Sequence, residues 1–405
     1  MMPESLICRI CGLSTKRVLD LGATPPANWL LDSLGETAPE YPLVLEECTC
    51  GNFQLGYCLD ANELYRHYNY VTPNSALLNQ HYIDLLEYMQ RQAFLSSKSR
   101  VLEIGSNVGL FLQFLKPHVQ SVIGVDPAQN LAKIASANGV ETLPQFFSKK
   151  FAGEYRTSKS PVDVIVARHC MAHNRDPYEV LGGVVELLSD DGVFVMENAY
   201  AIDTFENNEF DQLYHEHMFY YTLLAVRTMF ERVGLVLCDV LFSEVHGGSI
   251  VCFGKKRESA LRVEPDVAAA IVRERALLED GLIERFVAAV GTIQQNLRDV
   301  ISRYAAEGKT VYGYGATAKG ATLLNATGLT ARDIPYCADS TLIKQRRFIP
   351  KAGTEIVSEE WAFTHPPDAF LLTAWNYKDE LIAKARSAGL REVKFIVPVP
   401  SVEMV

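Results

Sequence analysis

The sequence predicts an α/β protein of three domains: a small cysteine-rich domain, a central Rossmann-like domain and a C-terminal Rossmann-like domain. Five of the nine cysteines lie within the first sixty residues. Two later stretches each run from a short apolar strand through a glycine-rich turn into a helix, which is how a doubly wound sheet begins. A length of 405 residues also exceeds what one core normally supports. We expect the domains to span about residues 1–75, 76–255 and 256–405.

The bulk composition is that of a globular protein, with 48% hydrophobic and 21% charged residues. The net charge of −11, without a block dense in Lys or Arg, argues against a nucleic-acid partner. Apolar runs are too short to span a bilayer, and residues 1–5 do not begin a signal peptide. We therefore expect a cytoplasmic protein with a small-molecule substrate and no membrane partner. The oligomeric state stays open, with a monomer as the working expectation.

The N-terminal cysteines form two close pairs, Cys8-Arg-Ile-Cys11-Gly and Cys48-Thr-Cys50-Gly. In a reducing cytosol such pairs indicate a metal site rather than disulfides. Two pairs suit a tetrahedral structural zinc, which would stabilise a segment too small for a full core. The second pair is spaced more tightly than usual, so Cys58 stays open as an alternative ligand. Reduced thiols without a metal are the competing interpretation.

The central segment begins with apolar residues at helical spacing over 76–94. A buried strand over 100–104 then runs into Gly105-Ser-Asn-Val-Gly109 and a short helix over 110–115. A second strand, 121–125, ends at Asp126. Further strands are expected over 162–167 and 192–197, which gives a parallel sheet with its ligand at the carboxyl ends of the strands.

The glycine-rich turn has the form Glu103-x-Gly105-x-Asn107-x-Gly109. It lacks the three glycines of a dinucleotide turn, and an acid before the first glycine repels phosphate. Such an acid suits an ammonium group or a ribose, and Asp126 can accept from two ribose hydroxyls. The pattern favours S-adenosylmethionine, which is cationic and has no phosphate, over NAD.

Two polar stretches follow the last parallel strand of the central segment. Tyr214-His-Glu-His217 places titratable side chains in a row, followed by a helix over 223–233 that Thr222 can cap and Gly234 can end. His246-Gly-Gly-Ser249 lies in a turn between two later strands. That turn is equally consistent with a plain hairpin and with backbone amides that face a ligand.

The third segment starts with a long amphipathic helix over 266–307, in which Gly281 and Gly291 are candidate interruptions. A strand then enters Gly313-Tyr-Gly-Ala-Thr-Ala-Lys319-Gly320, and later strands are expected over 334–338, 369–373 and 393–397. This loop and Lys319 suit a phosphate or ribose. Arg347 lies in a basic cluster with Lys344 and Arg346, for which a solvated loop is the alternative.

Five of these motifs occur together in one family: Cys8-x-x-Cys11-Gly, the turn from Glu103 to Gly109, Tyr214 to His217, His246 to Ser249, and Gly313 to Gly320. In this order they resemble the bacterial sugar C-methyltransferases, which use S-adenosylmethionine to methylate nucleotide-linked keto-sugars. The resemblance covers essentially the whole chain and implies a zinc-binding N-terminal domain, a class I methyltransferase domain and a C-terminal α/β domain. The Cys48–Cys50 spacing, the Val-Thr-Pro after Tyr70, and Ala321 with Ala326-Thr327 depart from the family pattern.

The resemblance also implies roles for individual residues. His217 is the expected general base, Glu216 or Tyr214 would orient it or contact the sugar, and Tyr70 would donate a hydrogen bond to the enolate or the sugar. Substrate contacts are expected from four further residues: His246, Tyr314, Lys319 and Arg347. Three alternatives stay open, namely an O- or N-methyltransferase, a two-Rossmann oxidoreductase, and a binding module without activity.

Overall fold

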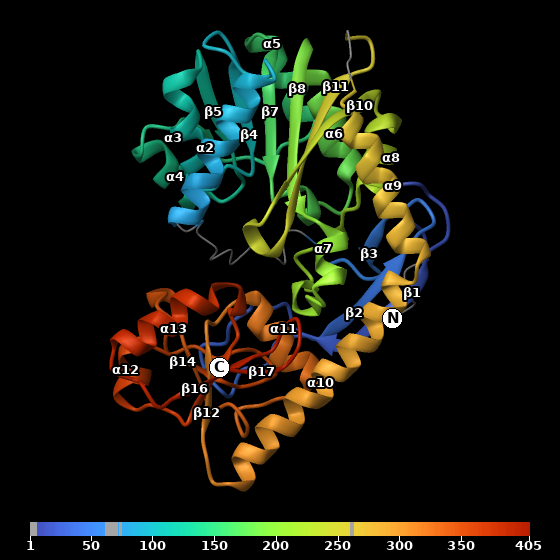
Figure 1. The fold of residues 1–405 in the computed structure, drawn as a ribbon. Helices are drawn as coiled ribbons and strands as arrows, with labels where there is room; N and C mark the ends of the chain where they lie inside the picture. The colour runs from blue at the N-terminus through green and yellow to red at the C-terminus, as the bar shows by residue number, and fades with distance from the viewer. Residues whose placement is uncertain (1–5, 61–71, 73–74, 260–262) are drawn as a thin grey trace.

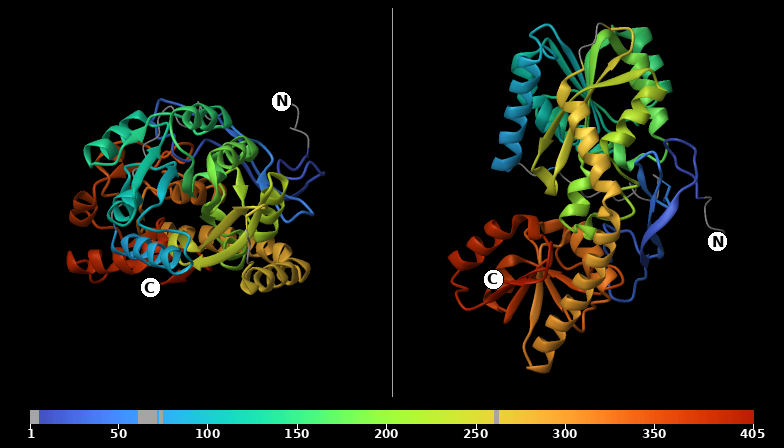
Figure 2. Two further views of the ribbon diagram at one scale, coloured as in Figure 1. Left: turned by 90° about the horizontal axis from the view of Figure 1, so that it is seen from above. Right: turned by 45° about the vertical axis from the view of Figure 1, so that its right-hand side comes forward.

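The computed structural model describes residues 6–60, 72, 75–259 and 263–405. It contains three sheets with helices around them, which confirms the predicted fold class. The central and C-terminal α/β domains are stacked one above the other, and the N-terminal domain lies along one side of their junction (Figure 1; Figure 2, right). The expectation for Tyr70 falls outside the described residues.

The N-terminal sheet is antiparallel and has the order β1-β2-β3-β9. Its first three strands are β1 (Lys16–Thr24), β2 (Tyr41–Glu47) and β3 (Phe53–Leu55). The fourth, β9 (Phe219–Tyr220), comes from the central segment of the chain. Two further hydrogen bonds run from the Arg9 guanidinium to the main-chain oxygens of Leu55 and Met218. The N-terminal domain is therefore built into the chain that directly follows His217.

The central sheet has the order β10-β11-β8-β7-β4-β5-β6, in which only β11 runs antiparallel to its neighbours. The strands are β4 (Arg100–Ile104), β5 (Ser121–Val125), β6 (Thr142–Leu143), β7 (Val162–Arg168), β8 (Leu188–Ala199), β10 (Leu235–Ser243) and β11 (Ser249–Lys256). Strands β4 and β7 and residues 192–198 of β8 are largely apolar and almost continuously buried, as expected for parallel strands covered on both faces.

The helices around this sheet are α2 (Ala76–Arg91), α3 (Leu110–Leu115), α4 (Gln129–Ala137), α5 (Lys149–Ser158), α6 (Pro177–Leu187), α7 (Ala201–Glu206) and α8 (Leu223–Arg232). Helix α2 buries Leu78, Tyr82, Leu85, Leu86 and Met89, the face that its spacing predicted. The Thr222 side chain accepts from Ala225 N and caps α8, which confirms the predicted start of that helix.

The C-terminal sheet has the order β14-β13-β12-β15-β16-β17 and is parallel except for β17. Its strands are β12 (Val311–Tyr314), β13 (Tyr336–Ala338), β14 (Glu355–Val357), β15 (Ala369–Leu372), β16 (Lys394–Val397) and β17 (Glu403–Met404). Helices α11 (Ala318–Thr327), α12 (Glu359–Thr364) and α13 (Lys378–Ser387) surround it.

The long helix expected over 266–307 is divided into α9 (Pro265–Glu279) and α10 (Leu282–Ala306). Gly281 separates them with φ +78°, a left-handed conformation that favours glycine, whereas Gly291 lies inside α10 without a break. Helix α9 packs on α8 and β10 of the central domain, and α10 continues to α7, α11 and β1 (Figure 1). This helix pair therefore connects all three domains.

Among the described residues, the structure contains no helix that is both long and apolar enough to cross a bilayer.

Candidate active site and metal centre

Four cysteine sulfurs converge in the N-terminal domain. The Sγ atoms of Cys8, Cys11, Cys48 and Cys50 all lie within 4.8 Å of one another. The Cys8–Cys50 pair is separated by 3.7 Å and the Cys11–Cys48 pair by 3.3 Å. A tetrahedral zinc with Zn–S bonds of about 2.3 Å requires sulfurs about 3.8 Å apart, so this cluster fits zinc.

The tight spacing of the second pair is accommodated by a turn at Gly51, whose φ is +84° and whose N–H donates to Cys48 O. Cys58 is buried outside the cluster. The choice of ligands left open by the sequence therefore falls on Cys48 and Cys50.

A cavity of about 730 Å³, here called the central pocket, lies at the carboxyl ends of β4, β5 and β7. Gly105, Asn107 and Asp126 line it together with Phe146, Phe147 and His169. Its volume lies in the ordinary range for small-molecule sites. The acid Asp126 in the pocket wall suits a cationic ligand such as S-adenosylmethionine. The absence of a three-glycine phosphate loop suits such a ligand as well.

Asp126 closes the glycine-rich turn. Its carboxylate accepts from Asn107 N at 2.8 Å and from Ala128 N at 2.9 Å, and burial raises its pKa. Gly105 has φ +67°, and a Cβ there would lie 2.8 Å from Cys170 Cβ. Gly109 follows with φ +75° at the start of α3. Four predicted cofactor residues therefore lie together at this turn: Gly105, Asn107, Gly109 and Asp126.

Glu103 has a different position from the one the sequence suggested. Its carboxylate is buried beneath the turn and pairs with Arg168, with Oε1 2.9 Å from both Nε and Nη2. It is Arg168, whose guanidinium also stacks on Tyr82 and Phe111, that lines the central pocket. Glu103 itself does not line the pocket and instead holds the arginine of the pocket wall. Its direct contact with a ligand stays a prediction.

Tyr214 and His217 are brought together by a turn. His217 N donates to Tyr214 O, and the Tyr214 hydroxyl lies 2.9 Å from His217 Nε2. A helix would also place residues i and i+3 side by side, but here a single tight turn does so.

The environment of His217 keeps its ring neutral. Burial lowers its pKa well below the ordinary value of 6.5, and the nearby His173, His169 and Lys319 lower it further. The His173 ring, 5.1 Å away, lines the central pocket. The His217 ring is therefore in the neutral form that a base requires, and the His173 ring separates it from the pocket.

Glu216 and His215 point towards the N-terminal domain. Glu216 accepts from the side-chain and main-chain nitrogens of Asn28 at 3.0 and 3.3 Å, and burial raises its pKa. The His215 ring packs edge-on against Tyr41. Neither residue contacts the His217 ring through a hydrogen bond among the described residues, so Glu216 holds this turn on the N-terminal domain.

Sequence reasoning missed a cluster around Glu197, at the carboxyl ends of β7 and β8. Glu197 Oε1 lies 2.6 Å from His81 Nε2 and 3.5 Å from His169 Nε2. These histidines hold the pKa of the buried carboxyl well below its usual range, although burial alone would raise it. The expectation that ligands bind at strand ends could have identified His169 and His173, which directly follow β7.

His246 lies on the wall of the central pocket, with its ring 4.5 Å from that of His169. It has φ +59°, and the two glycines that follow have φ of +93° and +115°. A Cβ at Gly247 would lie 2.5 Å from a Glu209 carboxylate oxygen, and one at Gly248 would lie 2.4 Å from an Asp203 oxygen. The turn is thus packed against acidic side chains rather than a plain exposed hairpin.

Lys319 reaches from α11 of the C-terminal domain to the central domain. Its ammonium lies 3.9 Å from Glu209 Oε2 and over the Trp375 ring, whose Nε1 donates to Asp211 at 2.6 Å. Its charge also lowers the pKa of both His217 and His246. Lys319 is therefore the C-terminal residue that the structure brings close to the candidate base.

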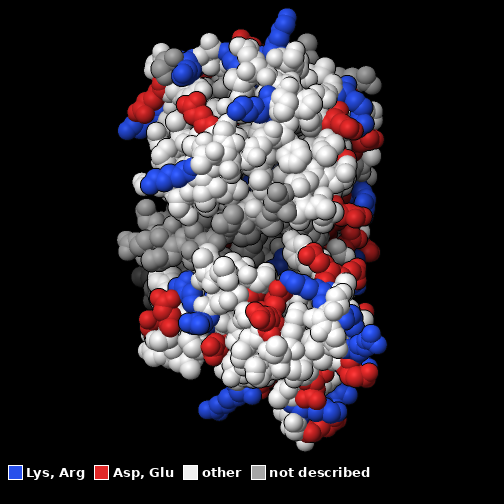
Figure 3. All heavy atoms as spheres, turned by 90° about the vertical axis from the view of Figure 1, so that its left-hand side faces the viewer, with Lys and Arg blue, Asp and Glu red and all other residues white. Residues whose placement is uncertain are grey.

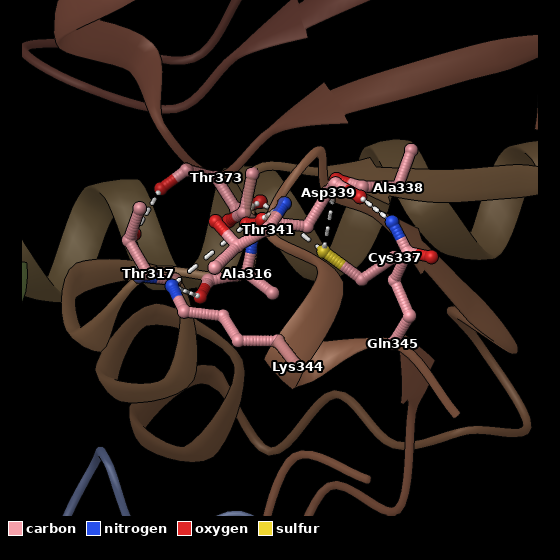
Figure 4. Close-up of polar contacts among 11 residues, drawn as sticks. Ala316, Thr317, Cys337, Ala338, Asp339, Thr341, Lys344, Gln345 and Thr373 are labelled. Atoms are coloured by element: carbon pink, nitrogen blue, oxygen red, sulfur yellow. Dashed lines mark hydrogen bonds and ion pairs between the residues drawn. The ribbon is translucent and has the colours of Figure 1, made fainter. Parts of the chain in front are cut away.

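The C-terminal domain repeats the geometry of the cofactor turn (Figure 4). Asp339, directly after β13, accepts from Ala316 N at 2.8 Å and from Thr341 N at 2.7 Å, as Asp126 accepts from Asn107 and Ala128. Lys344 lies beside it, with Nζ 2.8 Å from Ala316 O and 3.9 Å from Asp339 Oδ2. An acid that follows a strand and closes the preceding strand–helix loop thus occurs in both α/β domains.

Two predicted substrate residues lie elsewhere. The Tyr314 ring is buried in the core of the C-terminal domain, and its hydroxyl donates to Glu359 at 2.9 Å. Arg347 binds the N-terminal domain through Asp32 Oδ1 at 2.7 Å and Leu30 O at 2.9 Å. The expectation of substrate contacts is corrected for both, because strand alternation turns Tyr314 inward and Arg347 joins two domains.

Three family models match successive parts of the chain. The model described as "Putative zinc binding domain" matches residues 8–65, "Methyltransferase domain" matches 77–240, and "C-methyltransferase C-terminal domain" matches 244–400.

The C-methyltransferase NovU of Streptomyces niveus is 36% identical over 401 residues, which cover 97% of this chain and 95% of NovU. The uncharacterized methyltransferase YcgJ of Bacillus subtilis is 29% identical over 132 residues, or 30% of this chain and 51% of YcgJ. The crystal structure of YcgJ covers 44% of this chain and 100% of its own, with 20% identity and a TM-score of 0.35.

The match to NovU extends through all three domains. The chain therefore has a methyltransferase domain that binds S-adenosylmethionine, and the cysteine cluster belongs to a zinc-binding domain. The chain belongs to the family of S-adenosylmethionine-dependent C-methyltransferases.

Proposed function

We propose that this enzyme methylates a carbon atom of a nucleotide-linked keto-sugar, after His217 removes a proton from the carbon beside the ketone. The observation that carries the proposal is the neutral His217 ring beside Tyr214. The His173 ring separates it from the central pocket, which we propose as the methyl-donor pocket. Transfer of a methyl group to carbon requires a carbanion equivalent, and hence a base. An amine acceptor already offers a lone pair and needs no such step.

Individual residues have separate roles in the proposed reaction. His217 Nε2 accepts the carbon-bound proton, a role worth about 10²–10⁴-fold in rate. The Tyr214 hydroxyl, 2.9 Å from that nitrogen, orients the ring and can turn its hydrogen towards the enolate oxygen as charge develops there. S-Adenosylmethionine supplies an electrophilic methyl group. The role predicted for Tyr70, a hydrogen bond to the enolate or the sugar, stays part of the proposal.

The pH dependence of the reaction should reflect the lowered pKa of His217. Because its pKa is lowered well below 6.5, the ring stays neutral and basic when the pH falls through the range where an exposed histidine gains a proton. We expect the acidic limb of the kcat/KM profile to lie below pH 6.5. A limb at or above pH 6.5 that disappears in His217→Asn would contradict this electrostatic assignment.

The acceptor is proposed to be nucleotide-linked for two reasons. The C-terminal domain repeats the geometry of the cofactor turn, and its Lys319 lies near the candidate base His217. The close-up in Figure 4 shows Asp339 and Lys344 gathered at the strand ends of that domain. Positive and negative side chains are interspersed over the face in Figure 3, so local groups rather than a broad field must bind a pyrophosphate there. Lys319 is the proposed phosphate contact.

Replacing Lys319 tests this placement. Lys319→Met keeps the length of the side chain and removes its charge, so KM for the nucleotide-linked sugar should rise about tenfold or more while S-adenosylmethionine binding is unchanged. Lys309→Met is the matched control. Lys309 lies before the amino end of β12, whereas Lys319 lies after its carboxyl end, and Lys309 pairs with Glu307. Equal KM values for the two variants would refute a substrate contact by Lys319.

The function itself is tested by a turnover screen. Nucleotide-linked 4-keto-sugars are incubated with the enzyme and S-adenosylmethionine, and the products are examined by mass for the gain of one methyl group. Deuterium exchange from D2O into the sugar carbon, with S-adenosylhomocysteine in place of the donor, identifies the base-catalysed step. Methylation without exchange would favour the alternative, an O- or N-methyltransferase.

A further inference from the structure

A small cavity of about 20 Å³ lies beside His217. It is lined by His169, Asn198, Thr204, Gln212 and His217, together with Ala172, Ala199, Phe219 and Tyr220. A volume of about 10–15 Å³ is enough for one water molecule, so this cavity has room for a water and is far too small for a sugar.

Asn198 is the unusual residue of this cavity. Its side chain is only 2% exposed, and both Oδ1 and Nδ2 lack a hydrogen-bond partner among the described residues. Buried amides almost always have partners, because an unpartnered donor and acceptor lose their hydration without compensation. Since both ends of the amide are unpartnered, the conclusion does not depend on which end is nitrogen. One water in the cavity would supply both partners that this amide lacks.

His169 connects the cavity with the outside. It lines both the small cavity and the methyl-donor pocket, and 28% of its side chain is exposed, so a proton that it takes up can pass to solvent. Its Nε2 lies 3.5 Å from the Glu197 carboxylate, whose pKa is held well below its usual range, so this side of the ring faces a negative charge. His169 also has φ +49°, a left-handed conformation rarely adopted by residues other than glycine, and such strain is retained mainly at functional sites.

We propose that Asn198 positions one water between His217 and His169, and that this water carries the proton removed from the acceptor carbon out of the active site. The inference rests on the proposed function of His217. The imidazolium of His217 gives an N–H proton to the water oxygen, and the water gives one of its own protons to a ring nitrogen of His169. The ion pair with Glu197 stabilises protonated His169 until it releases the proton to solvent. His217 is thereby neutral again for the next turnover.

Asn198 acts through the water and is a positioning residue, so its test separates proton removal from proton release. In Asn198→Leu the cavity is filled and the amide lost. We expect deuterium exchange from D2O into the sugar, measured with S-adenosylhomocysteine bound, to fall about tenfold or more, because a proton trapped on His217 returns to the same carbon. Methyl transfer in a single turnover with S-adenosylmethionine should stay within about threefold of wild type, since it needs only proton removal. Asn198→Ser, whose hydroxyl can bind water, should regain most of the exchange.

Two outcomes would overturn the inference. One is normal exchange in folded Asn198→Leu; the other is an equal loss of exchange and single-turnover transfer, which would mean that Asn198 merely supports the base. A crystal structure of the wild-type enzyme gives a readout that needs no activity and no variant: it should show one water within about 3.2 Å of the Asn198 amide, and a dry cavity refutes the proposal. Failure of the proposed function is distinguishable, because wild-type enzyme would then exchange none of the keto-sugars.

Discussion

Replacing His217 with asparagine should lower turnover at least about a hundredfold while leaving S-adenosylmethionine binding intact. Asparagine is similar in size and can still bond to Tyr214, but it cannot accept a proton from carbon. The methyl-donor pocket should be unaffected, because His217 does not line it, whereas its neighbours His173 and His169 do. Product formation is measured by mass and binding of S-adenosylhomocysteine by calorimetry.

The control for this variant is His118→Asn, which changes an exposed histidine at the end of the 3₁₀ turn Lys116–His118. It should retain wild-type turnover and stability. If His217→Asn also turned over at a near-normal rate, His217 would not be the base. Loss of donor binding in His217→Asn would instead indicate that the change had disturbed the pocket, and the kinetic result would then say nothing in favour of base catalysis.

Removing a zinc ligand should have the largest effect on stability. We expect Cys11→Ser to lose the metal, which purified enzyme should carry at about one per chain, and to lower the free energy of unfolding by more than about 4 kcal/mol. Activity should fall as well, because β9, which follows His217 by two residues, is the last strand of the N-terminal sheet. Zinc is measured by elemental analysis and stability by thermal unfolding.

Cys58→Ser provides the matched control for the zinc variant. Cys58 is buried in the same domain but lies outside the cluster of four sulfurs, so this variant should keep its zinc and lose far less stability. A zinc content unchanged in Cys11→Ser, or abolished in Cys58→Ser, would show that the ligand set is wrong.

The order of the domains and much of the site could be predicted from short patterns in the sequence. The glycine-rich turn ending near Gly109 and the acid Asp126 were predicted because a parallel strand followed by a tight turn places its ligand at one edge of the sheet. The cysteine pairs indicated zinc for a similarly local reason, since each pair lies within one turn. The helix at Thr222 was predicted from its cap.

Strand alternation and long-range pairing decided the remaining features. Tyr314 follows the C-terminal glycine loop as a ligand residue would, yet its ring turns into the core and binds Glu359. The sequence indicates Arg347 as a phosphate-binding residue, but its side chain binds Asp32, more than three hundred residues earlier in the chain. Neither partner is visible in a local pattern.

The sequence by itself determined which chemical groups this protein has: four thiolates in two pairs, a phosphate-free cofactor turn, and a histidine row after the last parallel strand. Only the tertiary structure decided how those groups are used. It lowered the pKa of His217 so that its ring is neutral, paired Glu103 with Arg168, and assembled Glu197, His169 and Asn198 around the base. The reason is physical: local patterns fix backbone conformation, whereas burial and charge pairing depend on segments that meet only after the chain has folded.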